Sequence, residues 1–223
     1  MILTDTINNK SSLDLLQWHK RIREYMLTID SKFDLSHRID HVDRVINNAI
    51  SIQNNEGGEL AIIIPAVLLH DCIPVDKRSK LRARASQLSA EKAIELLHQW
   101  GYPQQYHPAI SNAIASHSFS ANLPTHTLEA MIVQDADRLD ALGAIGIARV
   151  FSLGGKFNST IYQYGDPFAT HRELDDKAYS LDHFYTKLLS LHSTFKTKTG
   201  RLIANERTQV MQQYLKDLRN EIE

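Results

Sequence analysis

The 223-residue sequence contains a single cysteine, Cys72, and no apolar run that approaches the ~20 residues needed to span a bilayer. A single cysteine excludes an intramolecular disulfide and is typical of a reducing compartment. The N-terminal residues lack the apolar core of a signal peptide. We therefore expect a cytoplasmic protein with no membrane partner.

An excess of charge is also absent, because 25 basic residues balance 26 acidic ones. The chain therefore has no overall field that would recruit a nucleic-acid polymer or an anionic membrane. Alternation of the kind that marks β-strands never extends beyond four residues, and no internal repeat is found. The sequence has instead helical periodicity and 11 histidines.

Apolar residues recur at helical spacing in a series of segments separated by Gly, Pro and Ser. The segments lie at about residues 11–26, 36–54, 59–72, 89–100, 103–117, 128–151, 180–191 and 200–218. They predict an all-α fold with a single compact multi-helix domain, in which an N-terminal helix (1–30) packs on residues 31–223. Pro65 predicts a kink or a late helix start. Gly143 and Gly146, inside the longest segment, indicate close packing against a neighbour.

The most informative stretch is the apolar run 66–69, which ends in His70 and Asp71. Burying an imidazole and a carboxylate there costs free energy unless both find partners. A metal ion satisfies both, since it binds a neutral imidazole nitrogen and an ionised carboxylate oxygen. The alternative is a helix C-terminus at which His70 bonds to the last carbonyl groups and Asp71 caps the next turn. The pair alone favours this alternative.

Two other segments offer further ligands. His41 lies close to the apolar face of its segment, although an isolated histidine there is more often a core residue bonded to a carbonyl. Asp135, Asp137 and Asp140 lie within a mainly apolar helical pattern. On one continuous helix Asp137 and Asp140 would be about 60° apart, and Asp135 about 200° from Asp137. A solvated acidic face is the alternative, but the apolar neighbours favour an interior polar cluster.

The order His41, His70-Asp71, Asp137 resembles the H…HD…D signature of the HD-domain metal-dependent phosphohydrolase superfamily. The segments HSFS at 117–120, IVQDADRLDALG at 132–143 and DPF at 166–168 are similar to one bacterial branch, the YedJ/YpgQ-like hydrolases. This similarity extends from about residue 31 to the C-terminus. The ADRL run at 136–139 looks like the family's final aspartate motif, which selects Asp137 over Asp135. One departure is Arg38, where the branch usually carries an aspartate.

The resemblance implies one divalent metal ion held by His41, His70, Asp71 and Asp137. Imidazole ligands favour Mn, Fe, Ni or Co over Mg. The implied activity is phosphohydrolysis of a nucleotide or another small phosphorylated metabolite, in one version the pyrophosphohydrolysis of nucleoside triphosphates. The alternative is a non-catalytic nucleotide-binding or sensing module. A homodimer is compatible with either.

The remaining site residues also depend on the resemblance, and several have an ordinary structural alternative. Asp71, Asp140 and His117 are the expected catalytic residues, with His117 protonating the leaving group or binding phosphate unless it only ends a helix. The expected substrate-binding residues are Lys77, Arg84, His37, His183 and Lys187. The alternatives are a solvated basic loop for the first two and a surface pair for the last two.

Overall fold

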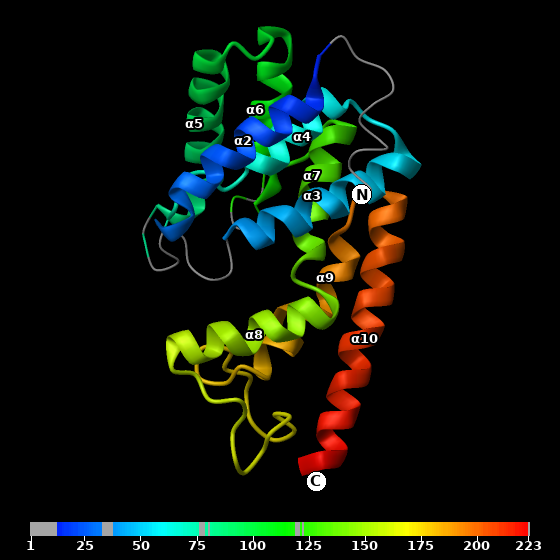
Figure 1. Cartoon of the computed structure of the whole chain (residues 1–223). Helices are drawn as coiled ribbons and strands as arrows, with labels where there is room; N and C mark the ends of the chain where they lie inside the picture. Colours follow the sequence, from blue (N-terminus) through cyan, green and yellow to red (C-terminus); the bar gives the residue numbers. More distant parts are fainter. Residues whose placement is uncertain are drawn as a thin grey trace. The chain divides into compact units, whose positions relative to one another are not determined.

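The computed structural model describes residues 13–32, 38–75, 79, 81–118, 121 and 123–222 (Figure 1). Within these ranges the chain forms helices and no β-strand, apart from one isolated bridge between Thr160 and Tyr179. The predicted all-α fold is confirmed. Among the described helices, none has the length and hydropathy to cross a membrane.

The chain divides into two compact units, residues 1–137 and 138–223. The helices of the first unit are α2 (Leu15–Ile29), α3 (Ile39–Glu56), α4 (Leu60–Leu69), α5 (Ala85–Trp100), α6 (His107–His117) and α7 (Leu128–Leu139), whose last two residues belong to the second unit. The second unit contains α8 (Gly143–Phe157), a π-helix (Phe184–Leu188), α9 (Leu189–Leu191) and α10 (Lys198–Ile222). The expectation of a single domain with a packed N-terminal helix stays a prediction.

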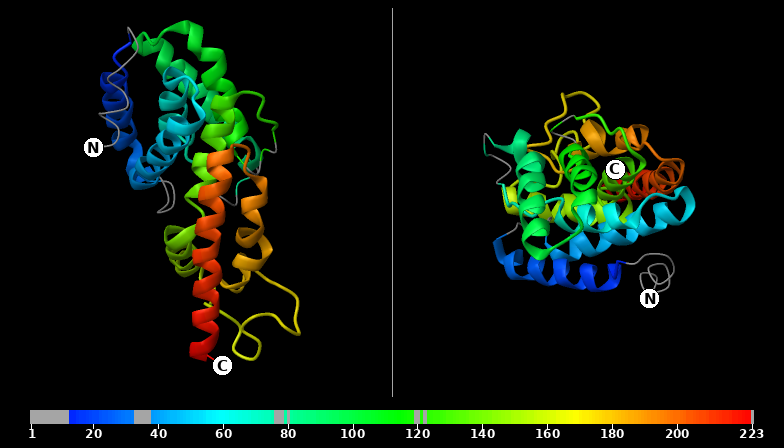
Figure 2. Two further views of the ribbon diagram at one scale, coloured as in Figure 1. Left: turned by 90° about the vertical axis from the view of Figure 1, so that its right-hand side faces the viewer. Right: turned by 90° about the horizontal axis from the view of Figure 1, so that it is seen from above.

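Helix α4 is the centre of the first unit. Eight of its ten residues are buried, and α2, α3, α5 and α6 all pack against it (Figures 1 and 2). Ile63, Ile64, Val67 and Leu68 are fully excluded from solvent. Each such side chain contributes about 1.5–3 kcal/mol to folding. The apolar faces of the neighbouring amphipathic helices enclose α4. This packing fixes the position of the residues that follow α4.

Pro65 lies inside α4 without interrupting it, so the predicted late start of this helix is wrong. Proline has no N–H, so the carbonyl of Ala61, four residues earlier, loses its helical donor. The hydroxyl of Tyr102 donates to this carbonyl at 2.5 Å. The tyrosine therefore satisfies a buried acceptor that the proline leaves free.

Glycine ends two helices where the sequence predicts it. Gly57 follows α3, and Gly101 follows α5 in the left-handed conformation, with φ of 78°. The predicted start of α5 at Ser89 is wrong, because the helix already begins at Ala85. Ser89 is fully buried inside the helix, and its hydroxyl accepts from the Ile73 backbone N–H at 3.3 Å. In the sequence alone, a serine inside a helix that bonds to a neighbouring loop looks the same as a serine that caps the helix.

The segment 128–151 is two helices rather than the single long one predicted, because α7 ends at Leu139 and α8 begins at Gly143. Gly143 adopts φ of 71°, and a Cβ atom there would lie 3.1 Å from Cγ of Arg207. Arg207 donates to the carbonyl of Leu139 at 2.6 Å. The close packing predicted for Gly146 is confirmed, since a Cβ atom there would collide with the Ala141 carbonyl.

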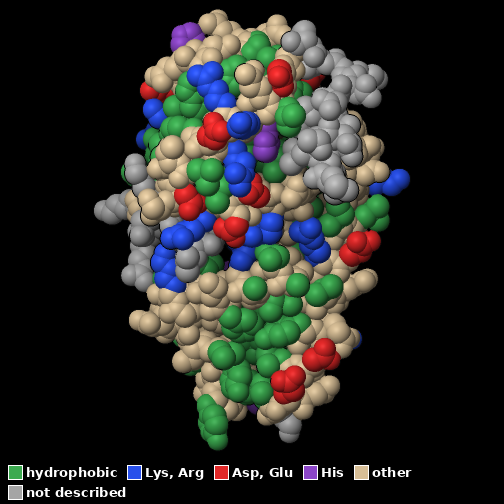
Figure 3. Space-filling view, in the orientation of Figure 1, with side chains coloured by type: hydrophobic (Ala, Val, Ile, Leu, Met, Phe, Trp, Pro, Cys, Tyr) green, Lys and Arg blue, Asp and Glu red, His purple; other side chains and the backbone are tan. Residues whose placement is uncertain are grey.

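The long loop at 159–179 in the second unit is held by polar contacts. Asp166 accepts from the backbone N–H groups of Thr170 and His171, and Arg172 forms a two-pronged ion pair with buried Asp182. Hydrophobic side chains gather over α8 on the face seen in Figure 3. Ile145 of α8 is 40% exposed. The second unit therefore combines a fixed loop with an uncovered apolar helix surface.

Candidate metal centre

Four helices of the first unit bring the predicted ligands together. His41 lies in the first turn of α3, His70 ends α4 and Asp71 follows it. Asp137 lies in the last turn of α7, and His117 is the last residue of α6. The ligands therefore come from helix ends, which meet because the helices pack around α4.

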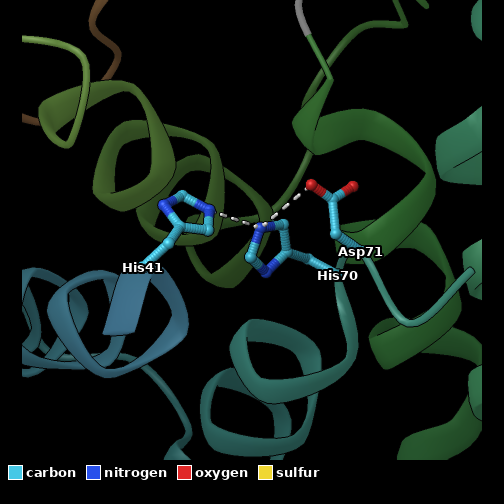
Figure 4. A group of neighbouring side chains, drawn as sticks. All are labelled: His41, His70 and Asp71. Atoms are coloured by element: carbon cyan, nitrogen blue, oxygen red, sulfur yellow. Dashed lines mark hydrogen bonds and ion pairs between the residues drawn. The ribbon is translucent and has the colours of Figure 1, made fainter. Parts of the chain in front are cut away.

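The donor atoms converge. His41 Nε2 lies 3.3 Å from His70 Nε2 and 3.5 Å from Asp137 Oδ1. His70 Nε2 lies 3.6 Å from Asp71 Oδ2 and 3.8 Å from Asp137 Oδ1. Figure 4 shows both imidazole rings and the Asp71 carboxylate directed toward one another. Donors that bind one ion at about 2.1 Å lie about 3 to 3.5 Å apart, so these residues fit a divalent cation.

The hydrogen bonding of His70 supports this fit. Its Nδ1 lies 2.7 Å from the Val67 carbonyl, which can only accept, so Nδ1 carries the hydrogen. In the neutral ring Nε2 is then a lone pair, and it faces two carboxylates and another imidazole nitrogen. A positive charge between this lone pair and the two carboxylates would stabilise the arrangement. A metal-binding histidine usually donates its other N–H to a carbonyl or carboxylate in this way.

The electrostatics put both ligand types in their metal-binding forms at neutral pH. Burial lowers the pKa of His70. The neighbouring imidazoles lower it further, whereas the two carboxylates raise it, and the net direction is downward. Burial raises the pKa of Asp137, but His70, His41 and His117 outweigh it and the net direction is downward. Hence His70 is neutral and Asp137 ionised, as a cation requires.

His117 lies against this cluster. It is 4% exposed, its ring lies edge-on to that of His70 at 4.9 Å, and its Nε2 lies 3.6 Å from Asp71 Oδ1. Burial lowers its pKa, but hydrogen bonding and charge from Asp71 outweigh burial, so the net direction is upward. Whether it acts in catalysis stays a prediction.

Two buried amides that sequence reasoning missed support the cluster. Asn48 on α3 donates to the Ala136 carbonyl at 3.1 Å, beside Asp137. Gln134 on α7 donates to the Ser116 carbonyl at 2.8 Å, beside His117. Both are polar residues at apolar positions of their helices, and that mismatch was the available signal.

Cys72, which directly follows Asp71, does not join the ligands described here. Its Sγ donates to the Ser89 carbonyl at 3.4 Å, and it is 2% exposed. Burial raises the pKa of its thiol to about 12. The thiol therefore stays protonated, whereas a metal ligand must be a thiolate.

Asp140 lies one residue beyond α7, in the turn before α8, so the continuous helix predicted through Asp137 and Asp140 ends before Asp140. It belongs to the second unit, where its carboxylate is buried and accepts from Arg149 at 2.7 Å. Its catalytic role stays a prediction.

Of the expected substrate-binding residues, His37 and Lys77 lie outside the described residues. Arg84 is exposed at the start of α5. His183 and Lys187 are half-buried in the second unit, and His183 bonds to Asp176 at 3.0 Å. The π-helix that starts after His183 winds less tightly than an α-helix, so four residues no longer make one full turn. Their roles also stay predictions.

The helical fold and the cluster of imidazoles and carboxylates, which could hold a metal ion, are those of a domain of the HD type. The HD domain family matches residues 38–142, and the chain belongs to this family. The match to individual relatives covers more of the chain than the match to the family. The chain is 32% identical to protein YpgQ of Bacillus subtilis over 212 residues, 93% of this chain and 95% of YpgQ.

Solved structures agree with this assignment. The crystal structure of Bacillus subtilis YpgQ in complex with ADP matches with a TM-score of 0.75 at 30% identity, covering 94% of this chain and 97% of that one. An HD-superfamily hydrolase from Bacillus thuringiensis matches with a TM-score of 0.72 at 29% identity, covering 93% and 97%. The resemblance to the YpgQ-like branch is confirmed.

Proposed function

We propose that this chain is a metal-dependent phosphohydrolase that acts on a nucleotide. The observation that carries the proposal is the convergence of His41, His70, Asp71 and Asp137, whose donor atoms lie 3.3–3.8 Å from one another in the pairs described. Two imidazoles and two carboxylates leave positions open on a divalent cation. The binding of ADP by the relative YpgQ supports a nucleotide as the substrate.

We assign a different role to each group of residues at the site. Bound at this site, a divalent cation would supply Lewis acidity that activates water and neutralises charge on the phosphoryl oxygens. Burial keeps His70 neutral, the bond from its Nδ1 to the Val67 carbonyl fixes its tautomer, and Asp137, whose pKa is lowered, is ionised at neutral pH. His117 is positioned against Asp71 to donate a proton. Asp140, Arg84, His183 and Lys187 are proposed to contact the substrate, with His37 and Lys77.

We further propose cleavage of the α–β bond of nucleoside triphosphates, as the YpgQ-like resemblance implies. The test is release of orthophosphate from a panel of ribo- and deoxynucleoside triphosphates with Mn²⁺, Co²⁺, Ni²⁺, Fe²⁺ or Mg²⁺. Orthophosphate is expected only when pyrophosphatase is added. Orthophosphate released without that enzyme would contradict this bond assignment.

The substitution Asp71→Ala removes a ligand and should lower turnover by about a hundredfold or more, together with the bound metal. Asp40→Asn is the matched control. Asp40 lies beside His41, but its side chain is 61% exposed and pairs with Arg44. An exposed pair of this kind contributes about 0.5 kcal/mol or less, so the control should keep metal and turnover. Unchanged metal content in Asp71→Ala would contradict the proposed site.

The second candidate is a nucleotide-binding module without catalysis. The complete ligand set disfavours it, because a binding module has no need to keep four metal donors. Nucleotide binding without turnover of any nucleotide in the panel would favour it.

A further inference from the structure

Helix α3, which carries the proposed ligand His41, begins at Ile39 and is preceded by Arg38 at its N-cap position. An N-cap residue usually has a short side chain that accepts from a backbone N–H of the first turn. Arg38 makes no such bond, and the Ile39 N–H donates instead to the Asp30 carboxylate at 2.7 Å. The positive charge of Arg38 also lies at the positive end of the helix dipole. Arginine is therefore unfavourable here for the stability of α3.

The guanidinium of Arg38 has no contact that offsets this cost. Its Nε is buried without an acceptor, and the part of the chain that the structure describes offers the guanidinium no ion pair or ring contact. The two acidic residues in the first turns of α3 are engaged by other arginines. Asp40 pairs with Arg44 at 2.7 Å, and Asp43 forms a two-pronged pair with Arg23 at 2.7 and 2.6 Å.

Arg38 lies beside the proposed metal centre. The backbone N–H of His41 donates to the Arg38 carbonyl at 2.9 Å. Side chains of an N-cap residue and of the residue three positions later lie on the same side of a helix start. The Nε2 of His41 lies 3.3 Å from His70 Nε2 and 3.5 Å from Asp137 Oδ1. The unpaired guanidinium therefore belongs to the same helix end as a residue of the centre.

A nucleotide supplies the anion that Arg38 lacks. A guanidinium is always charged, and its planar fork donates two parallel N–H···O bonds to phosphate oxygens. A divalent cation at the proposed centre would engage the neighbouring carboxylates, so they would not compete with phosphate for the arginine. A residue that breaks the rules of helix capping and gains no protein contact is typical of a functional site.

We propose that Arg38 binds a phosphate group of the nucleotide substrate. The inference rests on the proposed nucleotide hydrolase and adds a residue that recognises the anionic part of its substrate. The YedJ/YpgQ-like branch usually carries an aspartate at this position. Aspartate would cap the helix and repel phosphate, whereas arginine leaves the helix uncapped and attracts phosphate. Stability and nucleotide binding therefore place opposite demands on position 38.

The test is isothermal titration calorimetry of the full chain in excess Mn²⁺ with α,β-methylene-ADP, whose carbon bridge resists cleavage between the two phosphorus atoms. Arg38→Gln should weaken binding by about tenfold or more, since it removes a charge-assisted bond to phosphate. Arg38→Lys keeps the charge without the fork and should lose less. Arg38→Asp should lose about a hundredfold or more, because it places a negative charge beside the phosphate.

Thermal unfolding of the metal-free variants separates this role from a structural one. Arg38→Asp should raise Tm by about 2–4 °C, because aspartate caps the helix and suits its dipole. Lys20→Gln is the matched control for the loss of one positive charge. Lys20 is exposed on α2, so this variant should keep its Tm and bind the analogue within about twofold of the unmodified chain.

Binding of the analogue by Arg38→Gln and Arg38→Asp as tightly as by the unmodified chain would overturn the proposal. Weaker binding together with a lower Tm in Arg38→Asp would also overturn it, because the arginine would then act in folding. In either case hydrolysis of nucleotides by the unmodified chain would leave the proposed function intact. A chain that neither binds the analogue nor hydrolyses any nucleotide would overturn both.

Discussion

At the scale of single residues, the orientation of the histidines depends on backbone carbonyls. His70 and His117 each bond to a carbonyl three residues earlier at a helix end. This contact leaves Nε2 directed outward from the helix, and it also fixes the tautomer. The same local device at two helix ends explains why the cluster needs few side chains to orient it.

The choice of Asp137 over Asp135 shows what residue spacing alone leaves open. Both carboxylates interrupt the same apolar helix, and Asp135 is the more deeply buried, at 0% exposure. Which of them faces the imidazoles depends on the face that α7 turns toward α3, and the Asn48 bond to Ala136 helps to fix that face. Before the structure, only the similarity to the family's aspartate motif selected Asp137 over Asp135.

Tyr102→Phe should destabilise the protein by about 1–3 kcal/mol, because it leaves the Ala61 carbonyl buried without its donor. Pro65 cannot supply an N–H in its place. Tyr106→Phe is the control, since the half-buried Tyr106 lies beside Tyr102 and should change stability by no more than about 0.5 kcal/mol. Urea unfolding measures both. Equal stability of Tyr102→Phe and the unmodified chain would mean that the carbonyl has another donor.

At the scale of the helices, the sequence does not reveal the break between α7 and α8, because apolar residues continue across it. Leu139, Leu142 and Ile145 continue the helical period across the turn, so periodicity predicted one helix. The position of Gly143 was the available signal, but a glycine in a helix can also mark close packing, as Gly146 does. Gly57 and Gly101 were predicted correctly because polar or capping residues stop the period there.

Gly143→Ala should lower the free energy of unfolding by about 1–2 kcal/mol, since its φ of 71° disfavours a side chain. Crowding against Arg207 adds to this cost. Gly155→Ala, in the same helix, is the control. A Cβ atom there meets nothing within 4 Å, and alanine should stabilise the helix by up to about 1 kcal/mol. Thermal and urea unfolding should give opposite signs for the two variants; a shared sign would contradict the backbone argument.

At the scale of the whole molecule, all four proposed ligands belong to the first unit, residues 1–137. The all-α class followed from periodicity, because helical spacing is repeated along most of the sequence. The division of the chain into two units after Asp137 did not follow from periodicity, because it depends on contacts between segments distant in sequence. The expected homodimer stays a prediction, and the apolar surface over α8 is of the kind that oligomers bury.

Addition of Mn²⁺ to the metal-free chain should slow amide hydrogen exchange most in the ligand-bearing segments, by about tenfold or more. These are the first turn of α3, the end of α4 and the last turn of α7. Exchange followed by mass spectrometry measures the effect peptide by peptide. Asp71→Ala should show no dependence on Mn²⁺, and an equal effect in that variant would place the ion elsewhere.

The distribution of the ligands along the chain also affects the order of events in folding. His41 and Asp137 lie on α3 and α7, with α4, α5 and α6 between them. No short segment offers the full set, so an ion cannot nucleate local structure as it does in a small zinc finger. The complete site forms only after distant helices have packed. A bound ion should therefore slow the unfolding of the native chain and leave the rate of folding almost unchanged.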